Sequence, residues 1–212
     1  MFNKVINELK LQLQFELPGQ EIQFQMASSD RKLSPPDLTK ITGYKNSAVC
    51  ILLYWYNNTI YFPLIVRASY EGVHSGQIAL PGGKVEPSDI NLEETALREL
   101  GEETGYFSDK ITIIGELTAV YIPPSNFLVH PYIVFTNEIP VFNKSEKEVS
   151  ELIHFSINDL LDDNLVKLTT ITSENGDKIN APYFDVQGKI LWGATAMILN
   201  EFKKLLKQNK IT

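Results

Sequence analysis

The chain has 212 residues and a net charge of −7 at pH 7, and this length is sufficient for one sizeable domain with a buried core. Hydrophobic residues make up 43% of the sequence and charged residues 21%, as in ordinary soluble globular proteins. The acidic excess argues against a broad nucleic-acid or anionic-membrane surface, but it allows a small anionic substrate where a local basic patch and a metal offset the charge.

The N-terminal segment has apolar residues at helical spacing and predicts a helix that ends before Pro18-Gly19. These apolar residues are Phe2, Val5, Ile6, Leu9 and Leu13. Segment 26–46 is polar and turn-rich, with Pro35-Pro36 in its middle, and is interpreted as an ordered crossing or a lid. We expect one domain over residues 1–212, with residues 1–25 as a helical extension.

Two apolar runs, Ala48–Tyr56 and Ile60–Val66, are joined at Asn57-Asn58 and predict a β-hairpin. Cys50, the only cysteine, lies in the first run and is predicted to be a packed core residue rather than a reactive thiol. A single cysteine builds no disulfide framework, which fits a reducing compartment. Since no apolar run reaches 18 residues and no signal peptide is evident, we expect a cytoplasmic protein.

The remainder of the chain alternates strands with a few helices. A helix is predicted over about 91–104, with Asn91 or Ser88 as its cap and Gly105 as the residue that ends it. The other predicted elements are strands at 77–80, 111–120 and 128–135, a short element at 152–161, a hairpin over 179–190 and a C-terminal amphipathic helix over 194–206. This order predicts an α/β sandwich with helices on both faces of a mixed sheet.

The central helix carries an unusual cluster of acids. Glu99, Glu102 and Glu103 stand at i, i+3 and i+4, so they share one helix face. Each such like-charge pair costs about 0.2–0.5 kcal/mol of helix stability, and no lysine occurs between Lys84 and Lys110 to offset it. A bound divalent cation would offset this loss of helix stability. Mg²⁺ and Mn²⁺ are suitable, since they prefer oxygen ligands together with substrate phosphates.

These residues resemble a known family motif. Gly83 followed by RELGEETGY at 98–106 is similar to the Nudix box, Gly-x5-Glu-x7-Arg-Glu-U-x-Glu-Glu-x-Gly-U, in which U is apolar. The second half matches at every fixed position. One departure occurs in the first half, where the first glutamate is replaced by Asp89 and eight residues separate it from Arg98.

The resemblance implies a Nudix-type α/β/α sandwich and a metal-dependent pyrophosphatase. Glu99, Glu102 and Glu103 would hold one or more Mg²⁺ or Mn²⁺ ions against the substrate's pyrophosphate. Glu99 or a neighbouring carboxylate would accept the proton of the attacking water. Arg98 would orient a carboxylate from behind. Gly82-Gly83 would let the backbone approach the phosphates closely.

The segment before the box resembles the signature of the coenzyme A pyrophosphatase subgroup. The matching positions are Arg67, Ser69 (displaced by one), His74, Gly76, Gln77, Pro81, Gly82 and Gly83. The resemblance implies coenzyme A or an acyl-CoA as substrate, cleaved to 3′,5′-ADP and a 4′-phosphopantetheine product. Arg67 is the natural phosphate anchor. His74 is equally consistent with a ligand contact and with a loop-structuring contact, and Gln77 leans towards a structural role.

Several alternatives stay open at this point. Within the same chemistry, the substrate can be ADP-ribose, a dinucleotide or a damaged nucleotide. A Nudix domain that binds a nucleotide without cleaving it belongs to another functional class, although such domains usually lack one of the helix glutamates. Glu148 and Glu151 are expected on a solvated face, with a position near the metals as the alternative. The aromatic strand residues 54–56 and the N-terminal helix suggest a homodimer surface.

Overall fold

The computed structural model describes residues 2–33, 36–68, 76–172 and 176–208. The helices are α1 (Phe2–Gln12), α2 (Gly19–Phe24), α3 (Ser29–Leu33), α4 (Leu92–Thr104), α5 (Ile157–Leu161) and α6 (Gly193–Gln208), with 3₁₀ turns η1 (Leu38–Lys40), η2 (Pro123–Ser125) and η3 (Asp163–Leu165). The strands are β1 (Lys45–Tyr56), β2 (Thr59–Arg67), β3 (Ile78–Ala79), β4 (Gly82–Lys84), β5 (Thr112–Glu116), β6 (Val120–Ile122), β7 (Phe127–Phe135), β8 (Val149–Ser156), β9 (Val166–Thr172), β10 (Lys178–Val186) and β11 (Lys189–Leu191).

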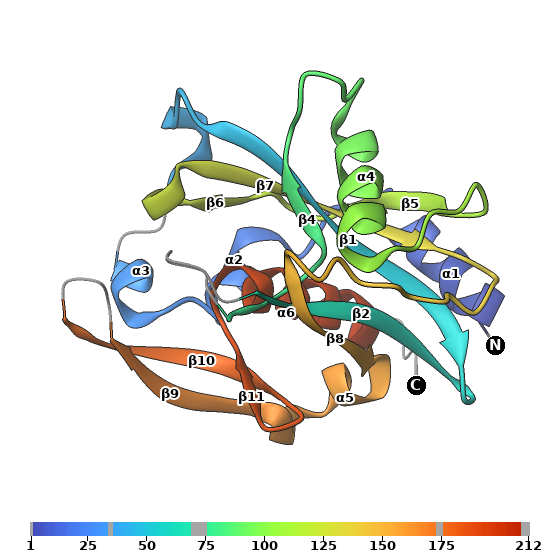
Figure 1. Ribbon diagram of the computed structural model, residues 1–212. Coiled ribbons are helices and arrows are strands. Elements are labelled where there is room, and N and C mark those ends of the chain that lie inside the picture. The colour runs from blue at the N-terminus through green and yellow to red at the C-terminus, as the bar shows by residue number, and fades with distance from the viewer. Residues whose placement is uncertain (1, 34–35, 69–75, 173–175, 209–212) are drawn as a thin grey trace.

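The long strand β1 organises the main sheet, which is mixed (Figure 1). It runs parallel to β7 from Lys45 to Leu53. Its C-terminal residues pair antiparallel with β2, whereas Ser47–Val49 pair antiparallel with β4. On its other edge, β2 pairs antiparallel with β8 from Tyr61 to Arg67. The partner of β1 therefore changes along its length, and this change brings the Gly82-Gly83 segment beside the start of β1.

Alternate residues of β1 face two hydrophobic cores, as expected for a strand buried on both sides. Ala48, Cys50 and Leu52 pack with Ala96 and Leu100 of α4. On the other face, a larger core joins β1 and β2 to α1, α2 and α6; its β1 members are Ile51 and Leu53. Figure 1 shows α4 on one side of the sheet and α6 on the other. The predicted α/β architecture with a mixed sheet between helices is thus confirmed.

The local predictions differ from the structure mainly in the second half of the chain. The hairpin at Asn57-Asn58 is present, and both asparagines have positive φ, 44° and 63°, the conformation that a tight type I′ turn requires. The single strand predicted over 111–120 is two strands, β5 and β6, which pair one after the other with β7 and are separated where the pairing is interrupted at Leu117–Ala119. A separate sheet with the order β11-β10-β9 was only half predicted, since the threonine-rich strand β9 shows little apolar alternation.

The aromatic residues considered for a dimer surface are mostly used inside the chain. Tyr54 is buried, and the ring of Trp55 lies 6.3 Å from that of Phe2 in α1. Only Tyr56 is substantially exposed. The homodimer stays a prediction. Among the described residues, no helix is both long enough and apolar enough to cross a membrane.

A buried carboxylate joins the C-terminal helix to the N-terminal region. Glu201 of α6 is fully buried and accepts four hydrogen bonds. One oxygen accepts from Gly19 N at 2.9 Å and from Thr118 Oγ1 at 2.6 Å, and the other from Gln23 Nε2 at 2.7 Å and from Thr118 N at 3.2 Å. This residue therefore fixes α2 and the segment between β5 and β6 against α6.

Glu201→Ala is expected to lower the free energy of unfolding by about 3 kcal/mol, because it leaves several buried donors without an acceptor. Urea denaturation of the variant and the wild type measures this difference. Glu21→Ala, which changes an exposed glutamate of α2, is the matched control and is expected to have little effect. Equal destabilisation by the two substitutions would contradict a special role for Glu201.

Candidate active site

Helix α4 begins and ends at residues that fix its position. Asn91 caps it, with Oδ1 accepting from Glu94 N at 2.8 Å, as predicted from the sequence. Gly105 ends it with φ of 70°, a left-handed conformation that glycine adopts without strain. A β-carbon at Gly105 would lie 2.1 Å from the carbonyl oxygen of Asn143. Glycine is therefore needed both for the turn and for the close approach of the segment before β8.

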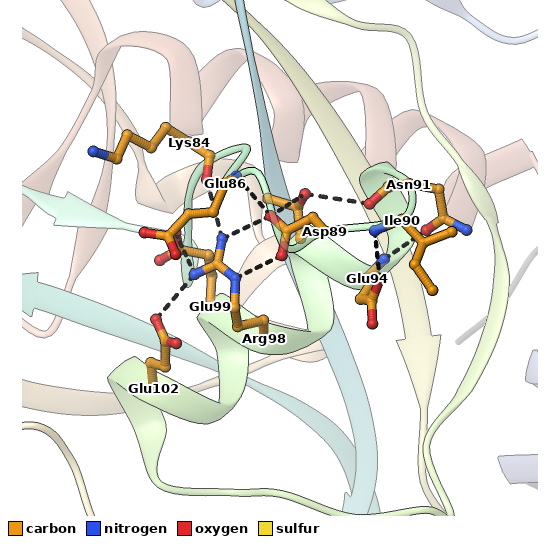
Figure 2. A network of polar contacts seen from close by, with 10 residues as sticks. Lys84, Glu86, Asp89, Ile90, Asn91, Glu94, Arg98, Glu99 and Glu102 are labelled. Carbon is orange, nitrogen blue, oxygen red and sulfur yellow. Dashed lines mark hydrogen bonds and ion pairs between the residues drawn. The ribbon is translucent and has the colours of Figure 1, made fainter.

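Arg98 connects the end of β4 to the acidic side chains of α4 (Figure 2). Its Nη1 donates to Glu99 Oε1 and to Glu102 Oε2, both at 3.0 Å. Its Nη2 donates to the carbonyl oxygen of Lys84 at 3.1 Å. The guanidinium group thus holds two carboxylates of the helix and the end of β4 in one arrangement.

Asp89 forms a bidentate ion pair with Arg98. Arg98 Nε donates to Asp89 Oδ1 at 2.8 Å, and Nη2 donates to Oδ2 at 3.0 Å. Oδ2 also accepts from Thr95 Oγ1 at 2.9 Å and from Glu86 N at 2.8 Å. The Arg98 guanidinium holds the pKa of Asp89 well below its usual range, although burial acts in the opposite direction. Asp89 thus binds the arginine of the motif despite the extra residue between them.

The Gly-Gly turn leaves room for two glutamates. A β-carbon on Gly83 would lie 2.3 Å from Glu99 Oε1, and one on Gly82 would lie 2.4 Å from the carbonyl oxygen of Ala48. Gly82 N donates to Glu103 Oε2 at 2.8 Å. The missing side chain of Gly83 therefore lets the Glu99 carboxylate lie directly against β4, whereas that of Gly82 lets β4 approach β1 closely.

These groups line a pocket of about 390 Å³. Its walls come from the ends of β2 and β4, from α4 and from the turn that leads into β8. The lining residues are Arg67, Ala68, Gly82, Gly83, Lys84, Glu99, Glu103, Lys147 and Glu148. The pocket thus brings together acids and bases that lie far apart in the sequence.

Burial dominates the electrostatics of the two helix acids. Glu103 is 3% exposed, and burial raises its pKa to about 7; Glu99 and Glu148 act in the same direction, while Arg67 and Gly82 N–H oppose them. Burial also raises the pKa of Glu99, against the lowering effect of Arg98. Carboxylates that are desolvated and repel one another are the groups that an added cation stabilises most.

The residues predicted from the sequence do not all reach the pocket. Arg67, Gly82, Gly83, Glu99 and Glu103 line it. Glu102 is not among the lining residues, and its side chain is 48% exposed beside Arg98. The carbonyl oxygen of Gln77 accepts from Arg67 N at 3.0 Å, and its side chain does not line the pocket. His74 lies outside the described residues.

Three charged lining residues, and the neutral Ala68, were not predicted as part of the site. Glu148 is exposed, as expected, but it faces the pocket instead of an ordinary solvated surface, whereas Glu151 pairs with Lys189 at 3.0 Å. Lys84 directly follows the Gly-Gly turn, which was the available signal for it. Lys147 had no signal in the sequence, because its position depends on how the segment before β8 folds back.

The donor set fits a hard divalent cation in its chemistry. Glu99, Glu103 and Glu148 supply carboxylate oxygens to one cavity, and such oxygens suit Mg²⁺ or Mn²⁺. Within the described ranges, no three such side chains already converge on one point as a metal cluster. Arg98 occupies one oxygen each of Glu99 and Glu102, so these carboxylates offer their other oxygens to a ligand.

Comparison with known proteins agrees with this arrangement. A protein of Yersinia enterocolitica described as an uncharacterized Nudix hydrolase, NudL, is 31% identical over 134 residues, 63% of this chain and 67% of that protein. The NudL of Pectobacterium atrosepticum is 27% identical over 173 residues, 79% of this chain and 85% of that protein.

Solved structures share the fold. An Ap4A hydrolase of C. elegans gives a TM-score of 0.52 at 16% identity, covering 77% of this chain and 98% of the other. The MutT protein of Methanosarcina mazei Go1 gives a TM-score of 0.51 at 20% identity, covering 79% of this chain and 96% of the other.

The sequence model of the NUDIX domain family matches residues 45–172, more than half of the chain. This match, together with the pocket that Gly83, Glu99 and Glu103 of the motif line, shows that the chain belongs to the Nudix family and is a Nudix hydrolase.

Proposed function

We propose that the protein cleaves the diphosphate bond of coenzyme A or an acyl-CoA, releasing 3′,5′-ADP and the (acyl-)4′-phosphopantetheine. The observation that carries this proposal is the pocket in which Arg67 of the subgroup signature and the Gly82-Gly83 turn lie opposite Glu99 and Glu103 of α4. A cation and a set of carboxylates facing each other suit a diphosphate that is bound together with a metal.

The chain's residues divide the work of hydrolysis. Glu99, Glu102 and Glu103 would hold Mg²⁺ or Mn²⁺, which supplies charge neutralisation at the phosphoryl oxygens and activation of water. Arg67 binds a phosphate oxygen with its guanidinium group. Arg98 orients Glu99 and Glu102 through the two hydrogen bonds that it donates.

The reaction adds one water across the P–O–P bridge. The water oxygen forms a bond to one phosphorus, the bond from that phosphorus to the bridging oxygen breaks, and the bridging oxygen leaves with the second phosphate. A pocket carboxylate must accept the proton of the water. Glu148 is available for this role, since among the described residues its carboxylate makes no hydrogen bond or ion pair.

Other substrates of the same chemical class remain alternatives, namely ADP-ribose, a dinucleotide or a damaged nucleotide. The resemblance at Arg67, Gly76 and Gln77 favours coenzyme A, although His74 of that signature lies outside the described residues. The presence of all three helix glutamates favours a catalyst over a nucleotide sensor. A cytoplasmic location stays a prediction.

Parallel assays with coenzyme A and ADP-ribose in Mg²⁺ or Mn²⁺ test the substrate. We expect coenzyme A to give equimolar 3′,5′-ADP and 4′-phosphopantetheine by liquid chromatography and mass spectrometry, with one ¹⁸O in a single product when the solvent is H₂¹⁸O. EDTA is expected to stop the reaction. Rapid turnover of ADP-ribose without turnover of coenzyme A or its thioesters would exclude the proposed substrate and leave the hydrolase assignment intact.

A further inference from the structure

The turn formed by residues 145–148 is attached to the pocket at both ends. Ser145 N donates to the carbonyl oxygen of Glu103 at 3.1 Å, which ties the start of the turn to the last turn of α4. Ala68 N donates to the carbonyl oxygen of Glu148 at 2.8 Å, which ties its end to the end of β2. Ser145 O closes the turn by accepting from Glu148 N at 3.2 Å. The 145–148 turn is thus held between the two walls of the pocket.

The segment that leads into this turn is also fixed. Asn143 N donates to the carbonyl oxygen of Thr104 at 2.8 Å, and Gly105 admits the carbonyl group of Asn143 at close range. In Figure 1 this segment passes the C-terminal end of α4 before it enters β8. The end of α4 therefore sets where the 145–148 turn lies.

Lys147 occupies this turn, is exposed and lines the pocket. Among the described residues its ammonium group has no ion-pair partner, whereas the nearby Lys144 pairs with Glu146 at 2.7 Å. The Lys147 ammonium group is therefore available to a ligand that enters the pocket.

The charges around the pocket indicate what kind of ligand this is. The carboxylates of Glu99, Glu103 and Glu148 line the same cavity as three cations, Arg67, Lys84 and Lys147. The structure shows no ion pair within 4.0 Å between these described acids and cations. A diphosphate bound with a divalent metal would satisfy both sets, because the metal meets the carboxylates and the phosphoryl oxygens meet the cations.

We propose that Lys147 binds a non-bridging phosphoryl oxygen of the substrate and is a substrate-binding residue of this site. The assignment rests on the proposed diphosphate hydrolysis and adds to it a contact from outside the Nudix motif. Lysine interacts with phosphate as a point charge, so the positive charge matters more than the shape of the side chain. Arginine at this position should therefore retain most of the binding.

Kinetics of Lys147→Met and Lys147→Arg test this contact. Loss of one charged hydrogen bond is expected to raise KM about 10-fold in the methionine variant, with kcat changed less than about 2-fold because binding of the ground state and of the transition state weaken alike. Lys147→Arg should stay near the wild type. Lys204→Met is the matched control, since Lys204 is exposed on α6, on the opposite side of the sheet.

Calorimetric titration with imidodiphosphate in Mg²⁺ separates this proposal from the proposed function, because the P–N–P bridge of this probe resists hydrolysis. We expect the Kd of Lys147→Met to rise by the same factor as KM, with wild-type values for Lys204→Met. Binding that depends on Lys147 in a protein that cleaves no nucleotide would support the contact and overturn the proposed reaction. Equal Kd values for the two methionine variants would overturn the role of Lys147, whatever the protein hydrolyses.

Discussion

Glu103→Gln is expected to reduce kcat by about 10³-fold or more, since loss of a charged ligand to the metal removes several kcal/mol of stabilisation from the transition state. The same substitution is expected to make the metal-free protein more stable at pH 7. Activity and stability should therefore change in opposite directions. This combination distinguishes a functional carboxylate from one that supports the fold.

The gain in stability follows from the direction of the pKa shift. Burial raises the pKa of Glu103 from 4.5 to about 7. Between these two values the folded protein keeps a proton that the unfolded chain has lost, so the free energy of unfolding falls as the pH rises. At pH 7 this penalty is about 2–3 kcal/mol. Glutamine has no such penalty, and its amide oxygen can still accept from Gly82 N, so the variant recovers most of this free energy.

Urea denaturation at pH 5 and pH 7.5, in EDTA and then in Mg²⁺ or Mn²⁺, measures both effects. The wild type should lose stability between these pH values in EDTA and recover it with the metal, whereas Glu103→Gln should respond less to both, with the remaining response due to Glu99, whose pKa burial also raises. Glu102→Gln is the matched comparison, because its side chain is half exposed; it should lose activity without gaining stability. If Glu103→Gln hydrolysed coenzyme A at the wild-type rate, the assignment of Glu103 to the metal site would fail.

The sequence predicted the parts of the site that are close together along the chain. Glu99 and Glu103 share a helix face by periodicity alone, and Asn91 and Gly105 are local capping signals. The positions of Glu148 and Lys147 depend instead on backbone hydrogen bonds between the 145–148 turn, α4 and β2. No local pattern encodes such contacts. For the same reason, β9 was missed, because its exposed threonine-rich face resembles a loop.

Substitution of Asp89 tests how the chain accommodates its departure from the Nudix box. Asp89→Ala is expected to lower the free energy of unfolding by about 2–4 kcal/mol, since the Asp89 side chain is only 2% exposed and its removal leaves Arg98 without its main partner. Activity should fall by about 10–100-fold, as for other residues that position a metal ligand indirectly. Denaturation and steady-state kinetics measure the two effects, and Asp109→Ala, which changes an exposed loop residue, is the control.

The spacing can be tested separately from the charge. Compared with the box, the chain has aspartate for glutamate and one more residue before Arg98, and we expect the longer segment to make up for a side chain that is one methylene shorter. Ile90 lies in this segment and is 86% exposed, so its deletion removes no core packing. Asp89→Glu alone should make the side chain too long, and deletion of Ile90 alone should leave Asp89 too far from the arginine. Combining the two changes restores the spacing of the box and should recover most of the stability and activity that either change loses. If the combined variant were no better than the deletion alone, the two departures would be independent of each other.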